Sequence, residues 1–257
     1  MAQLKLEKRG HTALITMSNP PANTWTRDTL TQLRNAVKSL DEDKNIYALV
    51  ITGEGDKFFS AGADLKLFAD GDKAVASDMA RIFGEAFETL SAFSGVSIAA
   101  INGYAMGGGL EVALACDIRI AEQQAQMALP EAKVGLLPCA GGTQNLAWLV
   151  GEGWAKRMIL CGERLGAEKA LQIGLVEEVV ATGMALESAL ALADKVAEQS
   201  PSSVTACKKL IQQGRSSSMQ SALPLERELF VGLFDTKDQV EGVQAFLDKR
   251  KANWVNG

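Results

Sequence analysis

The chain has 257 residues, of which 47% are hydrophobic and 22% are charged, a balance typical of an ordinary globular protein. This composition excludes a disordered or fibrous protein, and the length allows one large domain or one domain with an appendage. The formal net charge of -5 provides no overall positive field for the phosphates of nucleic acid. We therefore expect no nucleic-acid role.

The sequence also argues against membrane, metal and secretory classes. The first eleven residues contain charged side chains and no apolar run, so we expect a cytoplasmic protein. The most apolar stretch, 96–110, contains Asn102 and several glycines and is too short for a membrane span. The sole histidine, His11, lies in a predicted turn, so we expect no metal site. No cysteines form a C-x-x-C pair, which predicts buried thiols in a reducing compartment at Cys116, Cys139, Cys161 and Cys207.

The first segments predict a strand pair followed by a helix. Residues 4–9 and 12–17 flank a glycine and end at a proline-containing turn, as in two paired strands. Apolar residues then recur at three- and four-residue spacing, which predicts an amphipathic helix over 27–41 with Thr26 as its N-cap.

Strands and helices alternate over the next part of the chain. Nearly continuous apolar runs indicate parallel strands covered on both faces, and the segments between them have helical periodicity. This pattern predicts strands at 46–52, 96–101, 117–121 and 175–180, and helices around 79–90, 107–116, 143–150, 153–160 and 167–173.

From residue 184 onward the strand signals stop. Ser200 and Pro201 form a plausible N-cap and first helical residue, and Thr236 with Gln239 resembles a capping box. We therefore predict an α/β core over 1–183 and a C-terminal helical region over 184–257. A helical tail of this kind packs either on its own core or on a neighbouring subunit, and the pattern alone leaves both open.

Residues 102–117 (NGYAMGGGLEVALACD) pass from a strand end through three successive glycines into an apolar helix. Such glycines destabilise a chain unless its backbone has to be approached closely. The free N–H groups at the start of a helix can bind an anion or stabilise a developing oxyanion. A tight crossing between helix and strand is the alternative interpretation.

A second loop of small residues, 59–64 (FSAGAD), follows the preceding buried strand. Loops at the carboxyl ends of neighbouring parallel strands open onto one crevice, so the two loops are expected to converge. One N–H from each would form a two-donor oxyanion hole for a thioester carbonyl. An ordinary surface loop is the alternative.

Two glutamates are candidates for acid–base chemistry. Glu111 lies in the first turn of the apolar helix, where a buried carboxylate is unfavourable unless it is paired or functional. Glu131 follows Pro130 and is equally compatible with an acidic residue at a helix start. Two carboxylates in one crevice could instead share acid and base work.

Together these segments resemble the enoyl-coenzyme A hydratase/isomerase (crotonase) family from about residue 4 to residue 254. The resemblance implies an α/β fold with a repeated ββα-type (crotonase/ClpP-like) spiral core and a C-terminal helical region. It also implies a homotrimer, or a homohexamer built as a dimer of trimers, in which the C-terminal helical region 184–257 takes part in oligomerisation and covers the active site. The matching segments are 59–65 (FSAGADL), 100–111 (AINGYAMGGGLE), Pro130–Glu131 with Gly135, Pro138 and Gly141–Gly142, and 174–176 (GLV).

The resemblance further implies the roles of individual residues. Ala63 and Gly108 would supply the two N–H groups of the oxyanion hole, and Glu111 and Glu131 would be the two catalytic glutamates of a hydratase. The implied reaction is hydration of 2-enoyl-CoA thioesters to 3-hydroxyacyl-CoA in the β-oxidation of fatty acids. Coenzyme A enters as part of the substrate, and no cofactor or metal is expected. Contacts with coenzyme A are expected from Ala61, Asp64, Leu65 and Lys66, and contacts with its phosphates from Lys249, Arg250 and Lys251.

Other activities stay open from the sequence. An enoyl-CoA isomerase would need only Glu131, and another acyl-CoA lyase of the same family or a non-catalytic CoA- or RNA-binding protein are further alternatives. Lys249–Lys251 could simply complement a helix dipole. Departures from the family pattern at Asn145, Cys139 and Trp25 leave the acyl preference open. Trp25, Leu67, Phe68 and the segment 79–87 are candidates for the acyl tunnel or for the core.

Overall fold

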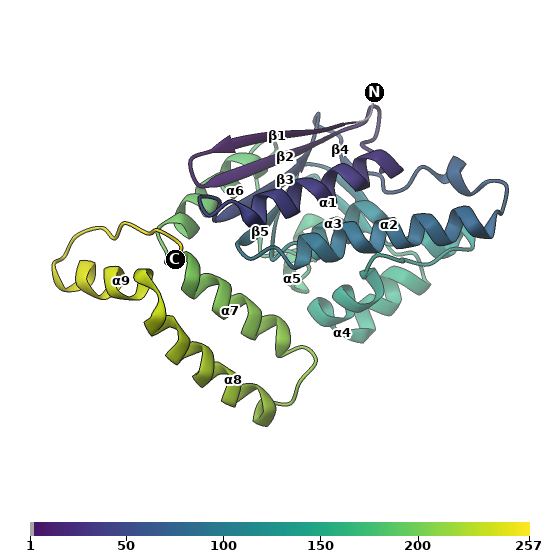
Figure 1. The fold of residues 1–257 in the computed structure, drawn as a ribbon. Helices are drawn as coiled ribbons and strands as arrows, with labels where there is room; N and C mark the ends of the chain where they lie inside the picture. The colour runs from purple at the N-terminus through teal and green to yellow at the C-terminus, as the bar shows by residue number, and fades with distance from the viewer. Residues whose placement is uncertain (1–2) are drawn as a thin grey trace.

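The computed structural model describes residues 3–257 (Figure 1). The larger of the two sheets in that range has six strands. The first two strands pair antiparallel, and every later neighbour in this sheet is parallel. In spatial order the strands are β1 (Gln3–Arg9), β2 (Thr12–Ser18), β3 (Ala48–Gly53), β5 (Val96–Ile101), β7 (Ile118–Glu122) and β10 (Glu178–Val180).

A second sheet of very short strands was not predicted from the sequence. Strands of two or three residues are too short for an alternating pattern to be recognised. Each of its first three strands follows a long strand of the first sheet along the chain and is parallel to its neighbour. The strands are β4 (Phe58–Ser60), β6 (Tyr104–Met106), β8 (Gln126–Ala128) and the antiparallel β9 (Leu165–Gly166).

A long strand, a short strand and a helix therefore form a unit that recurs three times before residue 161. The helices that complete these units are α2 (Lys73–Ser91), α3 (Gly108–Ala115) and α4 (Gly142–Leu160). This arrangement confirms the predicted ββα-type spiral core. The interruption predicted between 150 and 153 is also present, because Gly151 has φ 75° and ψ 160° inside α4. Helix α5 (Ala167–Gln172) matches the predicted helix at 167–173.

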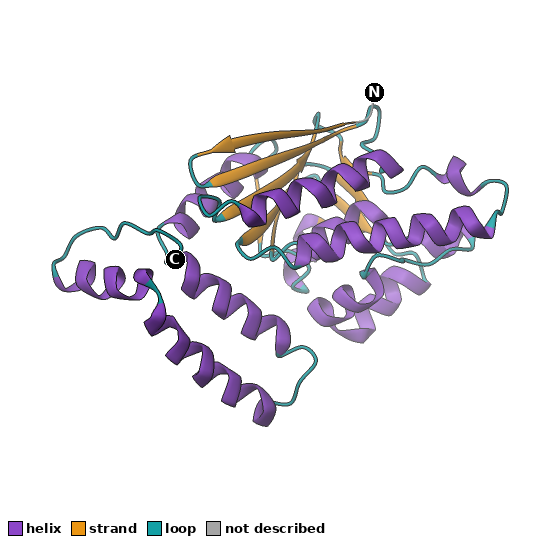
Figure 2. Ribbon diagram, in the orientation of Figure 1, coloured by secondary structure: helices purple, strands orange, loops and turns teal. Residues whose placement is uncertain are grey.

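Helices cover both faces of the six-stranded sheet (Figure 2). On one face, α1 (Arg27–Glu42) packs with α2 and buries Leu30, Leu33 and Val37 in the main core. The predicted N-cap is confirmed, since the Thr26 side chain accepts the N–H of Thr29. On the other face, α6 (Ala185–Ala197) packs against β3 and β5. The predicted helical region from residue 184 thus begins with a helix that rests on the core sheet.

The rest of the C-terminal region consists of α7 (Pro201–Gln213), α8 (Met219–Gly232) and α9 (Lys237–Leu247), which extend to one side of the core (Figure 1). The predicted starts of α7 and α9 are confirmed: Ser200 accepts from the N–H of Ser203 with Pro201 in the first turn, and Thr236 accepts from Gln239. The division of function at 183/184 stays a prediction.

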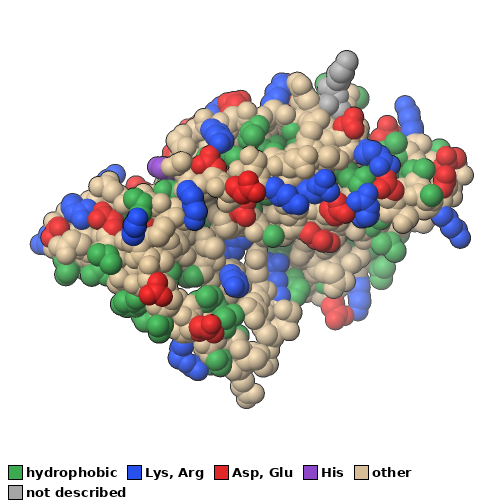
Figure 3. Space-filling model, in the orientation of Figure 1, with side chains coloured by type: hydrophobic (Ala, Val, Ile, Leu, Met, Phe, Trp, Pro, Cys, Tyr) green, Lys and Arg blue, Asp and Glu red, His purple; other side chains and the backbone are tan. Residues whose placement is uncertain are grey.

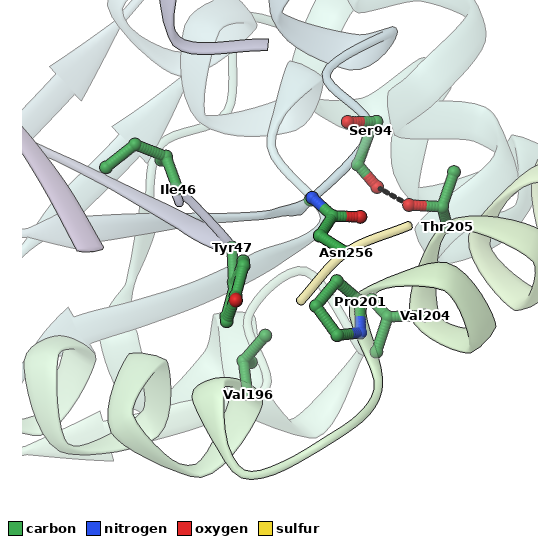
Figure 4. A pocket seen from close by; sticks show the side chains of 9 residues that line it. Ile46, Tyr47, Ser94, Val196, Pro201, Val204, Thr205 and Asn256 are labelled. Atoms are coloured by element: carbon green, nitrogen blue, oxygen red, sulfur yellow. Dashed lines mark hydrogen bonds between the residues drawn. The ribbon is translucent and has the colours of Figure 1, made fainter. Parts of the chain in front are cut away.

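Side chains from α7 attach this region to the core. The Lys208 ammonium donates to Phe93 O, to Gly95 O and to the Asp117 carboxylate at 2.6–2.9 Å. Nearby, a hollow between Tyr47 and Thr205 has a volume of about 10 Å³, room for roughly one water molecule (Figure 4). We interpret this hollow as a small packing gap between the core and the C-terminal helices, too small to hold a substrate.

The structure corrects the expectation for the cysteines. Cys116 is buried as predicted, but Cys139, Cys161 and Cys207 are exposed. Cys139 lies in the loop before α4, Cys161 is the C-cap of α4, and Cys207 lies within α7, so none of the three belongs to the buried α3 region that encloses Cys116. His11 is exposed in its turn as expected, stacked on Tyr47. Among the helices in residues 3–257, none combines the length and hydropathy that a membrane span requires.

Candidate active site

Three strands of the short sheet end at the same place, and the predicted site residues follow directly from those ends. β4 leads into Ala61–Ala63, β6 leads into Gly107 and Gly108, and β8 leads through Pro130 to Glu131. Because these strands are parallel neighbours, their carboxyl ends lie side by side. The short sheet is therefore what makes the two predicted loops converge.

The two small-residue loops are in van der Waals contact. A Cβ added to Gly62 would lie 2.9 Å from Gly108 N and 2.7 Å from Met106 O, and one added to Gly109 would lie 2.0 Å from Ser60 O. Both positions therefore require glycine. Gly62 also has φ +83°, a region that other residues rarely adopt.

The predicted oxyanion donors are unpaired within the described chain. Among residues 3–257, neither the Ala63 N–H nor the Gly108 N–H has a hydrogen-bond acceptor. Gly108 is the first residue of α3, so its N–H belongs to the unsatisfied group at a helix start. Trp25 N donates to Gly62 O at 2.8 Å and thereby holds the first loop in place. Two N–H groups on contacting loops are thus available to a substrate oxygen.

Glu111 is 3% exposed and is held by the turn that precedes α4. Its Oε1 accepts the N–H of Ala140 at 2.8 Å and the N–H of Gly142 at 3.0 Å. Burial raises the pKa of this carboxyl, whereas the two backbone bonds oppose that shift. These two donors were not predicted as site groups, although Gly141–Gly142 belonged to the matching segments.

Glu131 begins the 3₁₀ helix η2 (Glu131–Val134) and lies against the second loop. A Cβ added to Gly107 would be 3.0 Å from Glu131 Oε1. Its other oxygen, Oε2, is buried without a partner among the described residues. Burial is the main cause that raises its pKa to about 7, with a further contribution from the charge of Glu111. Glu131 can therefore hold or release a proton near neutral pH.

Cys139 lies close to both carboxyl groups, a proximity that the sequence did not reveal. The residue as a whole is exposed, but loss of hydration around the thiol raises its pKa, and the charges of Glu111 and Glu131 raise it further, to about 11. The thiol thus stays protonated and unreactive at neutral pH.

The predicted coenzyme A contacts fall into two groups far apart in the fold. Asp64 accepts from Lys66 N and caps the 3₁₀ helix η1 (Leu65–Phe68), which lies beside Ala61 and Ala63 and exposes Leu65 and Lys66. Lys249–Lys251 are exposed at the end of α9, on the opposite side of the molecule from η1 (Figure 1). Within one chain the two groups do not come together.

The candidate acyl-tunnel residues also divide. Trp25 is 1% exposed and packs edge-on against Phe87, and Phe83 packs against Phe87 in turn, so these rings belong to the core. Phe83 still touches the site, because its ring lies 3.0 Å from where a Cβ of Gly108 would be. Leu67 is partly exposed on η1.

Comparison with known proteins gives a family and a fold. Residues 7–257 match the family model described as enoyl-CoA hydratase/isomerase. The chain is 40% identical over 251 residues to the 2,3-dehydroadipyl-CoA hydratase of Escherichia coli, covering 97% of each chain. A solved structure of an enoyl-CoA hydratase from Bacillus anthracis is 35% identical with a TM-score of 0.95, covering 99% of each chain. A structure of Pseudomonas aeruginosa DspI is 68% identical with a TM-score of 0.96, covering 98% of this chain and 96% of that one.

Proposed function

The chain belongs to the enoyl-CoA hydratase/isomerase family and is an enoyl-CoA hydratase, a lyase of fatty acid metabolism, and we propose that Glu111 and Glu131 carry its chemistry. The observation that carries this proposal is the pair of carboxyl groups beside two N–H groups on contacting loops that have no acceptor in residues 3–257. The substrate is an acyl-CoA thioester with a double bond next to the carbonyl, and the product is a 3-hydroxyacyl-CoA.

The Ala63 and Gly108 N–H groups polarise the thioester carbonyl. Addition of water at C3 moves negative charge onto the carbonyl oxygen, and two fixed donors stabilise that charge more than they stabilise the starting carbonyl. Loss of one donor of this kind costs about 3–4 kcal/mol of transition-state stabilisation in comparable sites. The glycines of both loops are needed because any side chain would separate the two donors.

The two glutamates divide the proton transfers. Glu111 keeps one oxygen on the Ala140 and Gly142 N–H groups, which leaves the other to position water and to accept its proton. Glu131, with its pKa near 7, supplies the proton that C2 receives. The bond from the water oxygen to C3 forms as the C2–C3 double bond is lost, and proton exchange with solvent restores both carboxyl groups.

A direct assay tests the reaction and its runner-up. The conjugated enoyl thioester loses ultraviolet absorbance on hydration, and Glu111→Gln is expected to lower kcat about 100-fold or more by removing a general base. An isomerase would keep much of its turnover in the same variant, because it needs only Glu131. Glu122→Gln is the matched control: Glu122 is buried, but its carboxylate binds Gln124 and the Ala185 N–H, outside the site. Absence of hydration by wild-type protein with enoyl thioesters of graded length would contradict the proposal.

We propose that the η1 segment binds coenzyme A through Ala61, Asp64, Leu65 and Lys66. The position of η1 directly after Ala63 supports this role, since the thioester and its carrier are continuous. Lys249–Lys251 are proposed to meet the phosphates of a coenzyme A molecule on a neighbouring subunit. Arg250 is the least available of the three, because it already binds Glu241 at 2.7 and 3.0 Å.

We propose a homotrimer, or a homohexamer of two trimers, assembled through the C-terminal helices. Hydrophobic side chains gather on α8 and α9, at the lower left of Figure 3. Several exposed large apolar side chains on neighbouring helices are typical of subunit contacts. The exposed side chains on α8, on the 3₁₀ turn η3 (Leu233–Asp235) and on α9 include Phe230, Val231, Phe234, Val240, Val243, Phe246 and Leu247.

No cofactor or metal is proposed, because the thioester itself supplies the activating group, and dialysis against a chelator should leave turnover unchanged. A cytoplasmic location is proposed as well. It is supported by the free state of the four cysteines, as expected in a reducing compartment, and cell fractionation would test it.

A further inference from the structure

Arg119 is a buried charge that the chemistry described above does not use. It lies on β7, is 2% exposed, and sends its guanidinium toward the end of α3. Nη1 donates to Cys116 O at 2.9 Å and to Ala113 O at 3.5 Å. Nε donates to Leu175 O at 2.9 Å, and Nη2 donates to Asp117 O at 3.3 Å and to Glu177 Oε1 at 2.5 Å. Each of the five guanidinium N–H groups thus has an acceptor.

Two of these bonds go to carbonyl groups at the C-terminal end of α3, those of Ala113 and of the C-cap Cys116. The last carbonyls of a helix lack intrahelical donors, and every residue of α3 is buried away from water. At this end the Cys116 N–H binds Ala113 O at 3.2 Å, and side chains supply the other donors: Arg119 to the C-cap Cys116 O and, as a second donor, to Ala113 O, and Ser91 to Ala115 O. Of these donors, only Arg119 is a cation, the charge that complements the carbonyl end of a helix dipole.

The opposite end of the same short helix carries the chemistry. Gly108 provides an oxyanion donor from its first residue, and Glu111 lies one turn later. In the part of the chain that the structure describes, no side chain caps this end, and close packing of Gly109 against Ser60 limits movement toward the short sheet. A helix of eight residues moves as a rigid unit, so a shift at Ala113 is transmitted to Gly108 and Glu111.

We infer that Arg119 is a positioning residue for the hydration reaction. By binding the carbonyl end of α3, it fixes the positions of the Gly108 N–H and the Glu111 carboxylate relative to the thioester. Glu177 holds Arg119 in place through both carboxylate oxygens. Its Oε2 accepts the backbone N–H of Arg119 at 2.6 Å, and its Oε1 accepts from the guanidinium. The segment 174–176 takes part through the Leu175 carbonyl. The inference rests on the proposed function, because it acts through two residues of that site.

Two substitutions at Arg119 test this role. Arg119→Lys keeps the charge but loses the planar fork, and Arg119→Met keeps only the length. We expect kcat to fall about tenfold in the first and about 100-fold in the second, with KM changed less than about twofold, because a displacement of about 1 Å affects the transition state most. A second readout is the ultraviolet band of bound acetoacetyl-CoA, whose enolate form an intact oxyanion hole stabilises. We expect that band to weaken in the same order.

Glu122→Gln, on the same strand and also buried, is the control for lost stability. It should lower the melting temperature and leave kcat and the enolate band unchanged. Glu177→Gln changes a side chain that is 42% exposed, so it tests the role if Arg119→Met fails to fold, and it should lower kcat about three- to tenfold. Unchanged kcat and an unchanged band in both Arg119→Lys and Glu177→Gln would overturn the inference. Failure of the proposed function would appear differently, as absence of hydration by the wild-type protein.

Discussion

Glu131 shows at the scale of one residue how a site can oppose stability. Its unfolded pKa is 4.5 and its folded pKa is about 7, so the folded protein binds the proton more tightly than the unfolded chain does. Stability from this group is therefore fully present below pH 4.5 and is lost as the pH rises to about 7. Because the carboxyl is partly hydrated, the loss is about 1–3 kcal/mol.

Glu131→Gln should remove this penalty. At pH 8 we expect the free energy of unfolding of the variant to exceed that of wild type by about 1–3 kcal/mol, because the amide carries no charge to desolvate. Its hydration activity should fall. Urea unfolding at pH 8 and at pH 4 measures the difference, and the gain should disappear at the lower pH. An equal gain at both pH values would show that the charge is not its cause.

At the scale of an element, α3 is held tightly because its N-terminal glycines touch β4. Gly109→Ala would place a methyl group 2.0 Å from the carbonyl oxygen of Ser60, and Ser60 is itself fixed by its bond to Asn23 O. We expect the substitution to destabilise the protein by about 2–3 kcal/mol and to lower kcat at least about tenfold. Thermal melting and steady-state kinetics measure both effects.

The matched control for this substitution is Gly153→Ala in α4. A Cβ there meets nothing within 4 Å, and helical glycine is less favourable than alanine by about 1 kcal/mol. The control should therefore raise stability and leave kcat unchanged. If Gly109→Ala behaved like the control, the packing of α3 on β4 would not be what positions Gly108.

For the whole molecule, the apolar surface on α8 and α9 predicts assembly. Light scattering should give the mass of a trimer or a hexamer. Phe246→Ser, which changes a side chain that is 83% exposed, should weaken subunit association and increase the fraction of monomer. If Lys249–Lys251 bind phosphates across that interface, KM should rise in the same variant. Leu6→Ser on β1, away from α8 in Figure 1, is the control and should leave assembly intact. A monomeric wild type would contradict the proposed assembly.

Local sequence patterns were enough to predict the long strands, most helices and the caps at Thr26, Ser200 and Thr236. They also singled out the loops 59–64 and 107–109 and the carboxyl of Glu111, because glycines before a helix and an acid in a buried helix are unusual within a few residues of chain. Glu131 was a weaker candidate, and Ala63 and Gly108 were named as donors only by the resemblance. The resemblance to a family then assigned a role to each. These features depend on neighbours in the chain, so a single sequence contains them.

The short sheet, the surroundings of the cysteines and the contacts of Arg119 became known only from the tertiary structure. Strands of two or three residues are too short to show an alternating hydrophobic pattern. They form because β4, β6 and β8, which are far apart in the sequence, pair with one another in the fold. Arg119 looks like any charged residue on a strand until Leu175 and Glu177 are brought beside the end of α3. Burial and hydrogen bonding between distant segments depend on what packs against a residue, and packing is a property of the whole fold.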